Sequence, residues 1–175
     1  MRHLRPADYR VMPWKNGRGV TIELTRVDGA DGRFDWRASI ADVPDDGPFS
    51  RFDGYDRWIA VLAGAGMTLH HTRPEQPEAP PSVCRLEPRS VHGFAGDWDT
   101  WCTLIDGPVR DFNLMVRRGF AVGGIEVHAL RRGDESGLAS STRLVYALIG
   151  SCTVAAGRSA AGLAPGESAL LGEGD

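Results

Sequence analysis

Short runs that alternate apolar and polar side chains fill this chain, and the period of an α-helix is almost absent from it. Over residues 34–41, for example, Phe34, Trp36, Ala38 and Ile40 alternate with their neighbours. Every second residue of a β-strand faces the same side of its sheet, so the pattern predicts strands buried on one face. Turn formers, with 22 glycines and 11 prolines, separate the runs. Many short strands at close spacing predict an all-β sandwich or barrel.

The run Trp58–Leu62 is apolar at every position, which predicts a strand covered on both faces. Further strands are expected where similar short runs lie between turn dipeptides such as Asp53-Gly54. Their ranges are 20–27, 34–41, 67–71, 83–87, 101–105, 112–117, 127–130, 144–149, 153–156 and 168–171. Proline offers no N–H to a strand ladder, so the proline-rich stretch 73–82 is expected to be a solvated loop.

An apolar segment is repeated about half a chain apart. Arg57–Gly64 aligns with Arg143–Gly150 at an offset of 86 residues, and each copy is an arginine, an apolar run and a glycine. A strand unit that recurs at this distance indicates two similar β-barrel halves, with a chance similarity between two buried hairpins as the alternative. We expect a first domain at residues 1–120 and a smaller second half at 121–175, with strands that can be exchanged between them.

Charge and hydropathy argue against nucleic-acid and membrane partners. The formal net charge is −3, which gives no general attraction to a polyanion. No stretch approaches the roughly 20 apolar residues that cross a bilayer, and residues 1–10 contain no apolar signal segment. We therefore expect a cytoplasmic protein, in which Cys84, Cys102 and Cys152 are small core residues rather than disulfide partners.

The sequence gives little support for a metal site or for nucleophilic catalysis. A metal site needs three or four converging His, Cys or carboxylate ligands. His70 and His71 are adjacent, so they point to opposite faces of a strand, and His70 is the one expected to meet His92 across a hairpin. Neither a Gly-x-Ser-x-Gly motif nor a P-loop occurs. We expect exposed or hydrogen-bonded histidines, with no metal and no cofactor.

Three segments place charged or amide side chains directly beside aromatic ones: residues 13–21, residues 36–39 with 46–52, and residues 106–115. A buried polar group without a partner costs about 1–3 kcal/mol, so these groups either pair with one another or await a ligand. Mutual pairing is a strong alternative, because arginines and aspartates that can form ion pairs occur together in and near these segments. The candidates for such pairs are Arg37, Arg51, Arg57, Asp46, Asp53 and Asp111.

The same three segments resemble the HutD/Ves family. The motifs are Pro-Trp-Lys-Asn-Gly-x-Gly-x-Thr at 13–21, Trp-Arg-x-Ser-Ile-Ala at 36–41, Asp-Gly-Pro-Phe-Ser-x-Phe at 46–52 and Asp-Gly-Pro-Val-x-Asp-Phe-Asn-x-Met-x-Arg-Arg-Gly at 106–119. The resemblance covers the first 120 residues best and implies a bicupin, with two cupin-like (RmlC-like jelly roll) β-barrels in one chain.

The resemblance also implies a function. It suggests a regulator associated with histidine utilisation that binds a small metabolite, urocanate or a formylated glutamate, rather than an established enzyme. Cupin metal ligands are not expected, because Thr72 stands where the metal motif that follows Gly64 has its second histidine.

Candidate ligand residues come from the donors and rings of these segments. Donors to a carboxylate are Lys15, Asn16, Thr21, Arg57 and Asn113. Each charge-assisted hydrogen bond contributes about 1.5–3 kcal/mol in a partly dry site. Aromatic side chains could cover a flat ring, and Glu23 could accept from an imidazole N–H. The full predicted set is Trp14, Lys15, Asn16, Thr21, Glu23, Trp36, Ser39, Arg57, Phe94 and Asn113.

We therefore expect a non-catalytic sensor whose first barrel binds a small carboxylate metabolite and limits a catabolic pathway. One alternative is a cupin-type enzyme, an isomerase or hydrolase, that uses Glu23 or a histidine. Another is a protein-interaction module whose edge strands pair with a partner. Formation of a homodimer is compatible with each of these functions.

Overall fold

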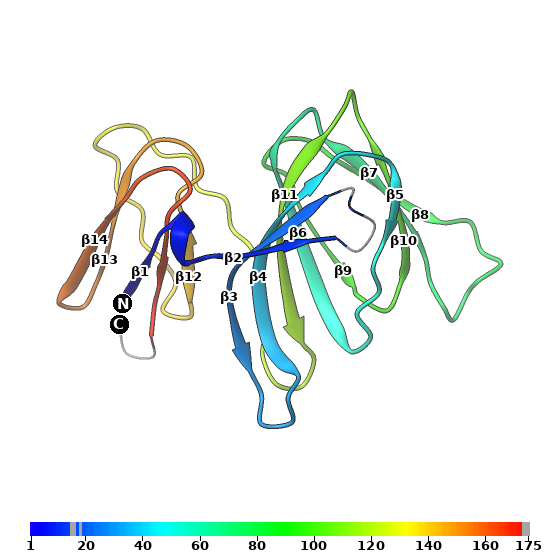
Figure 1. Cartoon of the computed structure of the whole chain (residues 1–175), viewed down its shortest axis with the longest axis horizontal. Helices are drawn as coiled ribbons and strands as arrows, with labels where there is room; N and C mark the ends of the chain where they lie inside the picture. The colour runs from blue at the N-terminus through cyan, green and yellow to red at the C-terminus, as the bar shows by residue number, and fades with distance from the viewer. Residues whose placement is uncertain (15–16, 18, 173–175) are drawn as a thin grey trace. The chain divides into compact units, whose positions relative to one another are not determined.

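The computed structural model describes residues 1–14, 17 and 19–172, and over these residues it contains fifteen strands, one short 3-10 helix, η1 (Pro6–Asp8), and no α-helix (Figure 1). The expectation of an all-β chain is confirmed. The chain divides into a larger compact unit, residues 10–127, and a smaller one, residues 1–9 with those from 128 onward. Within the described ranges, no helix has the length and hydropathy that a membrane crossing requires.

Two antiparallel sheets form the larger unit. The six-stranded sheet has the order β2 (Arg10–Pro13), β3 (Val20–Asp28), β4 (Phe34–Val43), β11 (Val109–Arg117), β6 (Tyr55–Ala63) and β9 (Val91–Ala95). The four-stranded sheet has the order β5 (Gly47–Phe49), β10 (Asp99–Leu104), β7 (Met67–Thr72) and β8 (Ser82–Leu86). Both orders end in edge strands, so no closed barrel of the expected kind is found among the described residues.

The core of the larger unit lies between its two sheets. Ile59 and Val61 alternate along β6 and point to this core, and Ala60 between them is also buried. Strand β6 is therefore covered on both faces, as its apolar run predicts. The core cluster consists of Val43, Ile59, Val61, Met67, Leu69, Leu86, Phe94, Cys102 and Val109. Full burial of each large apolar side chain stabilises the fold by about 1.5–3 kcal/mol.

The smaller unit is built from both ends of the described sequence. Its three-stranded sheet has the order β1 (Arg2–Leu4), β15 (Ser168–Leu170) and β12 (Leu144–Tyr146), and a separate hairpin joins β13 (Cys152–Ala156) to β14 (Ser159–Leu163). Its core is formed by Ala147, Val154, Leu163, Ala169 and Leu171. The Tyr9 hydroxyl donates to the Gly166 carbonyl oxygen at 3.0 Å, next to the pairing of β1 with β15. The N-terminal strand is thus part of a unit built mostly from C-terminal residues.

The structure corrects several expected elements. The strand expected at 127–130 is absent, and residues 118–143 contain no strand at all. An alternating run needs a partner strand for its N–H and C=O groups, and this one has none. Strands β1, β2, β5, β9 and β14 lie outside the expected ranges. The two compact units divide near residue 127, where the sequence suggests a boundary after residue 120, and the first nine residues belong to the smaller unit.

The three cysteines behave as predicted. Cys84, Cys102 and Cys152 are free thiols. Cys102 belongs to the core of the larger unit, while Cys84 and Cys152 pack against the cores of the larger and the smaller unit, respectively. Burial raises the pKa of the Cys102 thiol to about 12, which makes it unreactive.

Candidate functional site

Polar side chains interrupt the apolar inner face of the six-stranded sheet in three adjacent cross-strand rows. In register, the rows are Thr21, Ala41, Asp111 and Val61; then Glu23, Ser39, Asn113, Ile59 and His92; then Arg37, Met115, Arg57 and Phe94. All of these positions share the face of the core residues Ile59 and Val61. Six residues of the predicted ligand set therefore lie together: Thr21, Glu23, Ser39, Arg57, Phe94 and Asn113.

Arg57 on β6 carries a positive charge inside the core. The residue is 4% exposed, and its guanidinium carbon lies 5.1 Å from the ring centre of Phe94 and 5.5 Å from those of Phe49 and Phe52. Its Nη1 donates to the Ser50 carbonyl oxygen at 3.0 Å, whereas its buried Nε has no partner among the described residues. Burial lowers the pKa of Arg57 to about 10. The group is therefore charged at neutral pH and has an unused donor.

Arg37 on β4 brings a second guanidinium to the ring of Phe52. Its guanidinium carbon lies 5.5 Å from the ring centre of Phe52, and its Nε is also buried without a partner in the described part of the chain. Burial lowers the pKa of Arg37, while Glu23 acts against this shift. No carboxylate of the described residues forms an ion pair with Arg37 or Arg57. Two like charges thus share one ring, and a bound anion would relieve their repulsion.

Asp111 and Asn113 on β11 place acceptors in the same interior. They are 1% and 6% exposed, and the Oδ1 atom of each is buried without a hydrogen-bond partner in the described residues. Burial raises the pKa of Asp111 to about 7, although the charge of Arg57 counteracts the shift. Below that pH the Asp111 carboxyl is mostly neutral, so it can donate a proton to a hydrogen bond and does not repel an anion.

A histidine pair continues the polar interior from β9 to the opposite sheet. His71 on β7 and His92 on β9 place their Nε2 atoms 3.0 Å apart, and His71 Nδ1 lies 2.9 Å from the Thr100 hydroxyl. Phe94 stacks within 4.7 Å of His71 and 5.7 Å of His92. Burial, together with the neighbouring His92 and Arg57, lowers the pKa of His71 to about 4, and burial also lowers the pKa of His92. Both imidazoles are therefore neutral at pH 7.

The expected meeting of His70 with His92 is wrong. The two adjacent histidines do point to opposite faces of β7, but His71 is the buried one. His70 lies across from Trp101 and Val83, which are exposed on the other face of the four-stranded sheet.

We call Arg37, Phe52, Arg57, Phe94, His71 and His92 the guanidinium–aromatic cluster. A cavity of about 100 Å³ borders this cluster at His71. It is lined by His71, Arg73, Gln76, Ala79, Pro80 and Ser82. Of the guanidinium–aromatic cluster, only His71 lines this cavity.

The remaining predicted residues lie elsewhere. The Trp14 ring packs against the core of the larger unit, and its Nε1 donates to the Thr21 hydroxyl at 2.9 Å. Trp36 lies on the opposite face of the six-stranded sheet from Arg37 and Ser39, so it cannot cover a ligand in this interior. Lys15 and Asn16 lie outside the described residues.

Several residues of this polar interior are missing from the predicted set. Arg37 and Asp111 lie two positions from the predicted Ser39 and Asn113, so strand alternation alone places them on the same face. His71 and Phe52 carry no such local signal. Their position depends on the packing of the two sheets, which is set by residues far apart in the chain.

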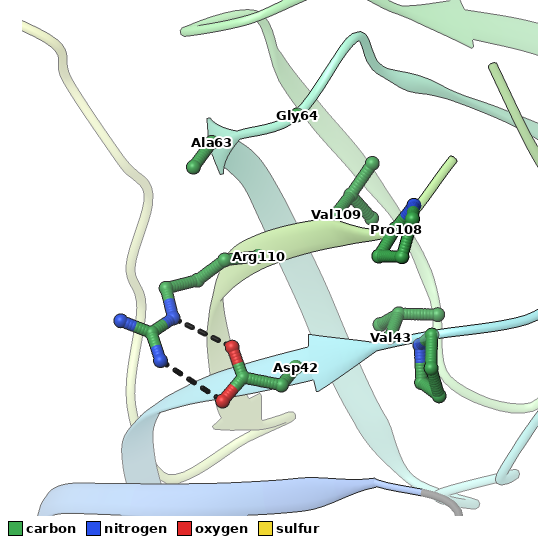
Figure 2. A pocket seen from close by; sticks show the side chains of 8 residues that line it. Asp42, Val43, Ala63, Gly64, Pro108, Val109 and Arg110 are labelled. Atoms are coloured by element: carbon green, nitrogen blue, oxygen red, sulfur yellow. Dashed lines mark hydrogen bonds and ion pairs between the residues drawn. The ribbon is translucent and has the colours of Figure 1, made fainter. Parts of the chain in front are cut away.

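A second cavity, of about 250 Å³, is lined by the C-terminal ends of β4 and β6 and by the N-terminal end of β11 (Figure 2). Its walls are mostly apolar, with Val43 and Val109 among them. At one side, Arg110 donates to both carboxylate oxygens of Asp42, at 2.6 and 2.9 Å. Because these two charges pair with each other, this cavity gives less reason to expect an anion than the interior cluster does.

The described residues contain no group of three or more His, Cys, Asp or Glu side chains that could hold a metal ion. The two imidazole nitrogens of His71 and His92 are therefore not part of a larger ligand set in this part of the chain. The absence of a metal from the protein stays a prediction.

Comparison with known proteins identifies the family. The HutD family model matches residues 6–175. A relative from Pseudomonas putida, described as an uncharacterized 21.2 kDa protein in the hutC 3' region, is 47% identical over 114 residues, which cover 64% of this chain and 56% of the relative. Protein Ves from Citrobacter koseri is 36% identical over 115 residues, or 63% of this chain and 56% of the relative.

Solved structures agree with this result. The structure of HutD from Pseudomonas fluorescens SBW25 matches with a TM-score of 0.58 and 43% identity, covering 67% of this chain and 60% of that one. A conserved protein of unknown function from Pseudomonas aeruginosa PAO1 matches with a TM-score of 0.57 and 48% identity, covering 67% and 57%. This chain spans little more than half the length of the curated relatives that it matches. Because the family model covers nearly all of the sequence, the chain belongs to the HutD family.

Proposed function

We propose that this chain binds a small carboxylate in the guanidinium–aromatic cluster. The observation that carries the proposal is the pair Arg37 and Arg57, two guanidiniums over the ring of Phe52, each with a buried Nε that has no partner in the described residues. A carboxylate matches the planar, forked donor geometry of a guanidinium. The ligand supplies the ion-pair partner that these two cations lack among the described residues.

The energetics favour occupation of the site. A buried donor without a partner costs about 1–3 kcal/mol, and a charge-assisted hydrogen bond contributes about 1.5–3 kcal/mol. A carboxylate that accepts from Arg37 and Arg57 therefore forms strong bonds and also removes an existing penalty. The aromatic rings around both guanidiniums exclude water, which strengthens the attraction.

The biological role that we propose is regulatory. Membership in the HutD family and a relative described by its position beside hutC support a link to histidine utilisation. We propose a cytoplasmic, non-catalytic sensor of the pathway whose ligand is urocanate or a formylated glutamate. We further propose that the two β-units are cupin-like halves of a bicupin, which the family resemblance and the repeated apolar segment support.

Calorimetric titration of the full chain with urocanate, formylglutamate and histidine tests the binding proposal. We expect saturable binding of at least one carboxylate, weakened about tenfold or more in an Arg57→Met variant, since one charge-assisted bond is lost. Methionine retains a long side chain among the rings, and thermal melting checks that the variant is folded.

The matched control is Arg51→Met. Arg51 is exposed, lies in the connection between β5 and β6, and donates to the Asp53 carboxylate. We expect this control to bind the ligand as the wild type does. If no compound binds at millimolar concentration, or if both variants lose affinity equally, the proposal is wrong.

A further inference from the structure

We infer that the outer face of the four-stranded sheet is a docking surface for a second copy of this chain. The central row of this face, in register across the sheet, is Pro48 on β5, Trp101 on β10, His70 on β7 and Val83 on β8. We call these four residues the outer row. They lie on the opposite side of the sheet from His71 and the guanidinium–aromatic cluster, so the inference goes beyond the proposed function and does not depend on it.

The outer row exposes large apolar side chains next to one another. Trp101 is 50% exposed and Val83 is 63% exposed, and Pro48 is exposed as well. Neighbouring strands lie about 4.8 Å apart, so a row across four strands is about 15 Å long. Single exposed apolar side chains are common on monomers, whereas a contiguous group with an aromatic centre is typical of protein interfaces. The outer row therefore has the character of an interface centre.

Opposite charges lie on either side of the outer row. Arg85 on β8 lies in the next row to one side, and Asp99 on β10 lies in the next row to the other side. Each shares the outer face, because it is two positions along its strand from Val83 or Trp101. A two-fold dimer joins the same surface of both copies, so this surface must be complementary to itself. One cation and one anion about an apolar centre meet this condition, since Arg85 of each copy can face Asp99 of the other.

Both charges are available to a second copy. Arg85 belongs to no ion pair of the described residues. Asp99 lies 3.5 Å from Arg51, but Arg51 donates more closely to Asp53, at 3.1 Å, and the Asp99 side chain is 63% exposed. Exposed ion pairs add little stability to a monomer, whereas like charges brought together across an interface weaken association. Arg85 and Asp99 thus determine which surface can pack on the outer row.

The edges of this sheet suit a partner less well than its face. Strand β5 spans three residues and contains Pro48, and Pro80 and Pro81 come directly before β8. Short edge strands and prolines discourage the addition of a further strand. The second copy therefore packs through side chains of the face rather than through strand pairing.

Sedimentation velocity of the full chain tests the inference. We expect a dimer whose dissociation constant rises about tenfold or more in a Trp101→Ser variant, since a central tryptophan commonly dominates the energy of association. The matched control is Val122→Ser, because Val122 is fully exposed and lies outside the sheets. This control should dimerise as the wild type does, and thermal melting checks that both variants are folded.

Charge reversal tests whether the partner is a second copy. In an Arg85→Glu dimer two carboxylates face each other at both contacts, and in an Asp99→Arg dimer two guanidiniums do. We expect each variant alone to associate about tenfold more weakly than the wild type. In an equimolar mixture, Glu at position 85 of one variant faces Arg at position 99 of the other, and the unchanged Asp99 faces the unchanged Arg85. The mixture should therefore dimerise within about threefold of the wild-type affinity.

Three outcomes overturn the inference. A wild type that stays monomeric at about 100 µM refutes it and leaves the outer row to a partner of another kind. A Trp101→Ser variant that dimerises as tightly as the wild type shows that any dimer uses a different surface. A mixture that associates no more tightly than either charge variant alone excludes the pairing of Arg85 with Asp99 across the dimer.

Discussion

At the scale of single residues, the carboxyl group of Asp111 lies inside the core, where burial raises its pKa to about 7. In the unfolded chain the same group titrates at about 4. Between these values the folded protein holds a proton that the unfolded chain releases. The free energy of unfolding therefore falls by roughly 1.4 kcal/mol for each pH unit of increase, and the loss is complete above about pH 7. His71, whose pKa is lowered to about 4, has the opposite effect over much of this range.

The effects of Asp111 and His71 on stability overlap in pH. The contribution of Asp111 is therefore isolated by comparing the wild type with an Asp111→Asn variant. The amide cannot ionise, so we expect the stability of the variant relative to the wild type to rise by roughly 1.4 kcal/mol per pH unit from about pH 5 to pH 7, and then to level off. Urea unfolding of both proteins across this range measures the difference. A difference between Asp111→Asn and the wild type that does not change with pH would contradict the raised pKa.

At the scale of structural elements, the turn from β6 to β7 depends on Gly66. Its φ is +119°, and a Cβ added there would lie 2.3 Å from the Leu86 carbonyl oxygen, which is backbone and cannot easily move. We expect Gly66→Ala to lower the free energy of unfolding by more than about 2 kcal/mol. Gly107→Ala is the matched control, since Gly107 has a φ of +95° but open space around it, and it should cost about 1 kcal/mol. Urea unfolding compares the two, and equal losses would show that the contact with Leu86 is unimportant.

The same scale explains which elements can be predicted from the sequence. Strands β3, β4, β6 and β11 are long, and their period-two alternation is visible within each strand. The same alternation places Arg37 with Ser39 and Asp111 with Asn113 on one face of each strand, whereas the pairing of Ser39 with Asn113 depends on β4 and β11 being neighbours. Strands β5 and β9 are short and contain Pro48 and Gly93, so nothing local distinguishes them from turns. The choice of His71 over His70 depends on how two sheets pack, which no local pattern contains.

At the scale of the whole molecule, similar sequences form strands of very different length. The first copy of the repeated segment lies in β6, which spans nine residues and pairs with strands on both sides. The second copy contributes β12, which spans three residues at the edge of a three-stranded sheet. A strand extends only as far as its partners offer hydrogen bonds, so the repeat predicts two related halves without predicting their size.

The smaller unit combines residues from both sides of a long irregular segment, so cutting this segment should not release the C-terminal part. Residues 118–143 contain no strand, and Arg131 and Arg132 are exposed to trypsin. Strand β1 pairs with β15, and His3 Nε2 lies 2.8 Å from the Glu167 carboxylate. We expect early cleavage at these arginines, delayed in an Arg131→Gln, Arg132→Gln double variant. The two fragments should elute together from a sizing column under native conditions and separate only in denaturant, whereas separation without denaturant would contradict the pairing of β1 with β15.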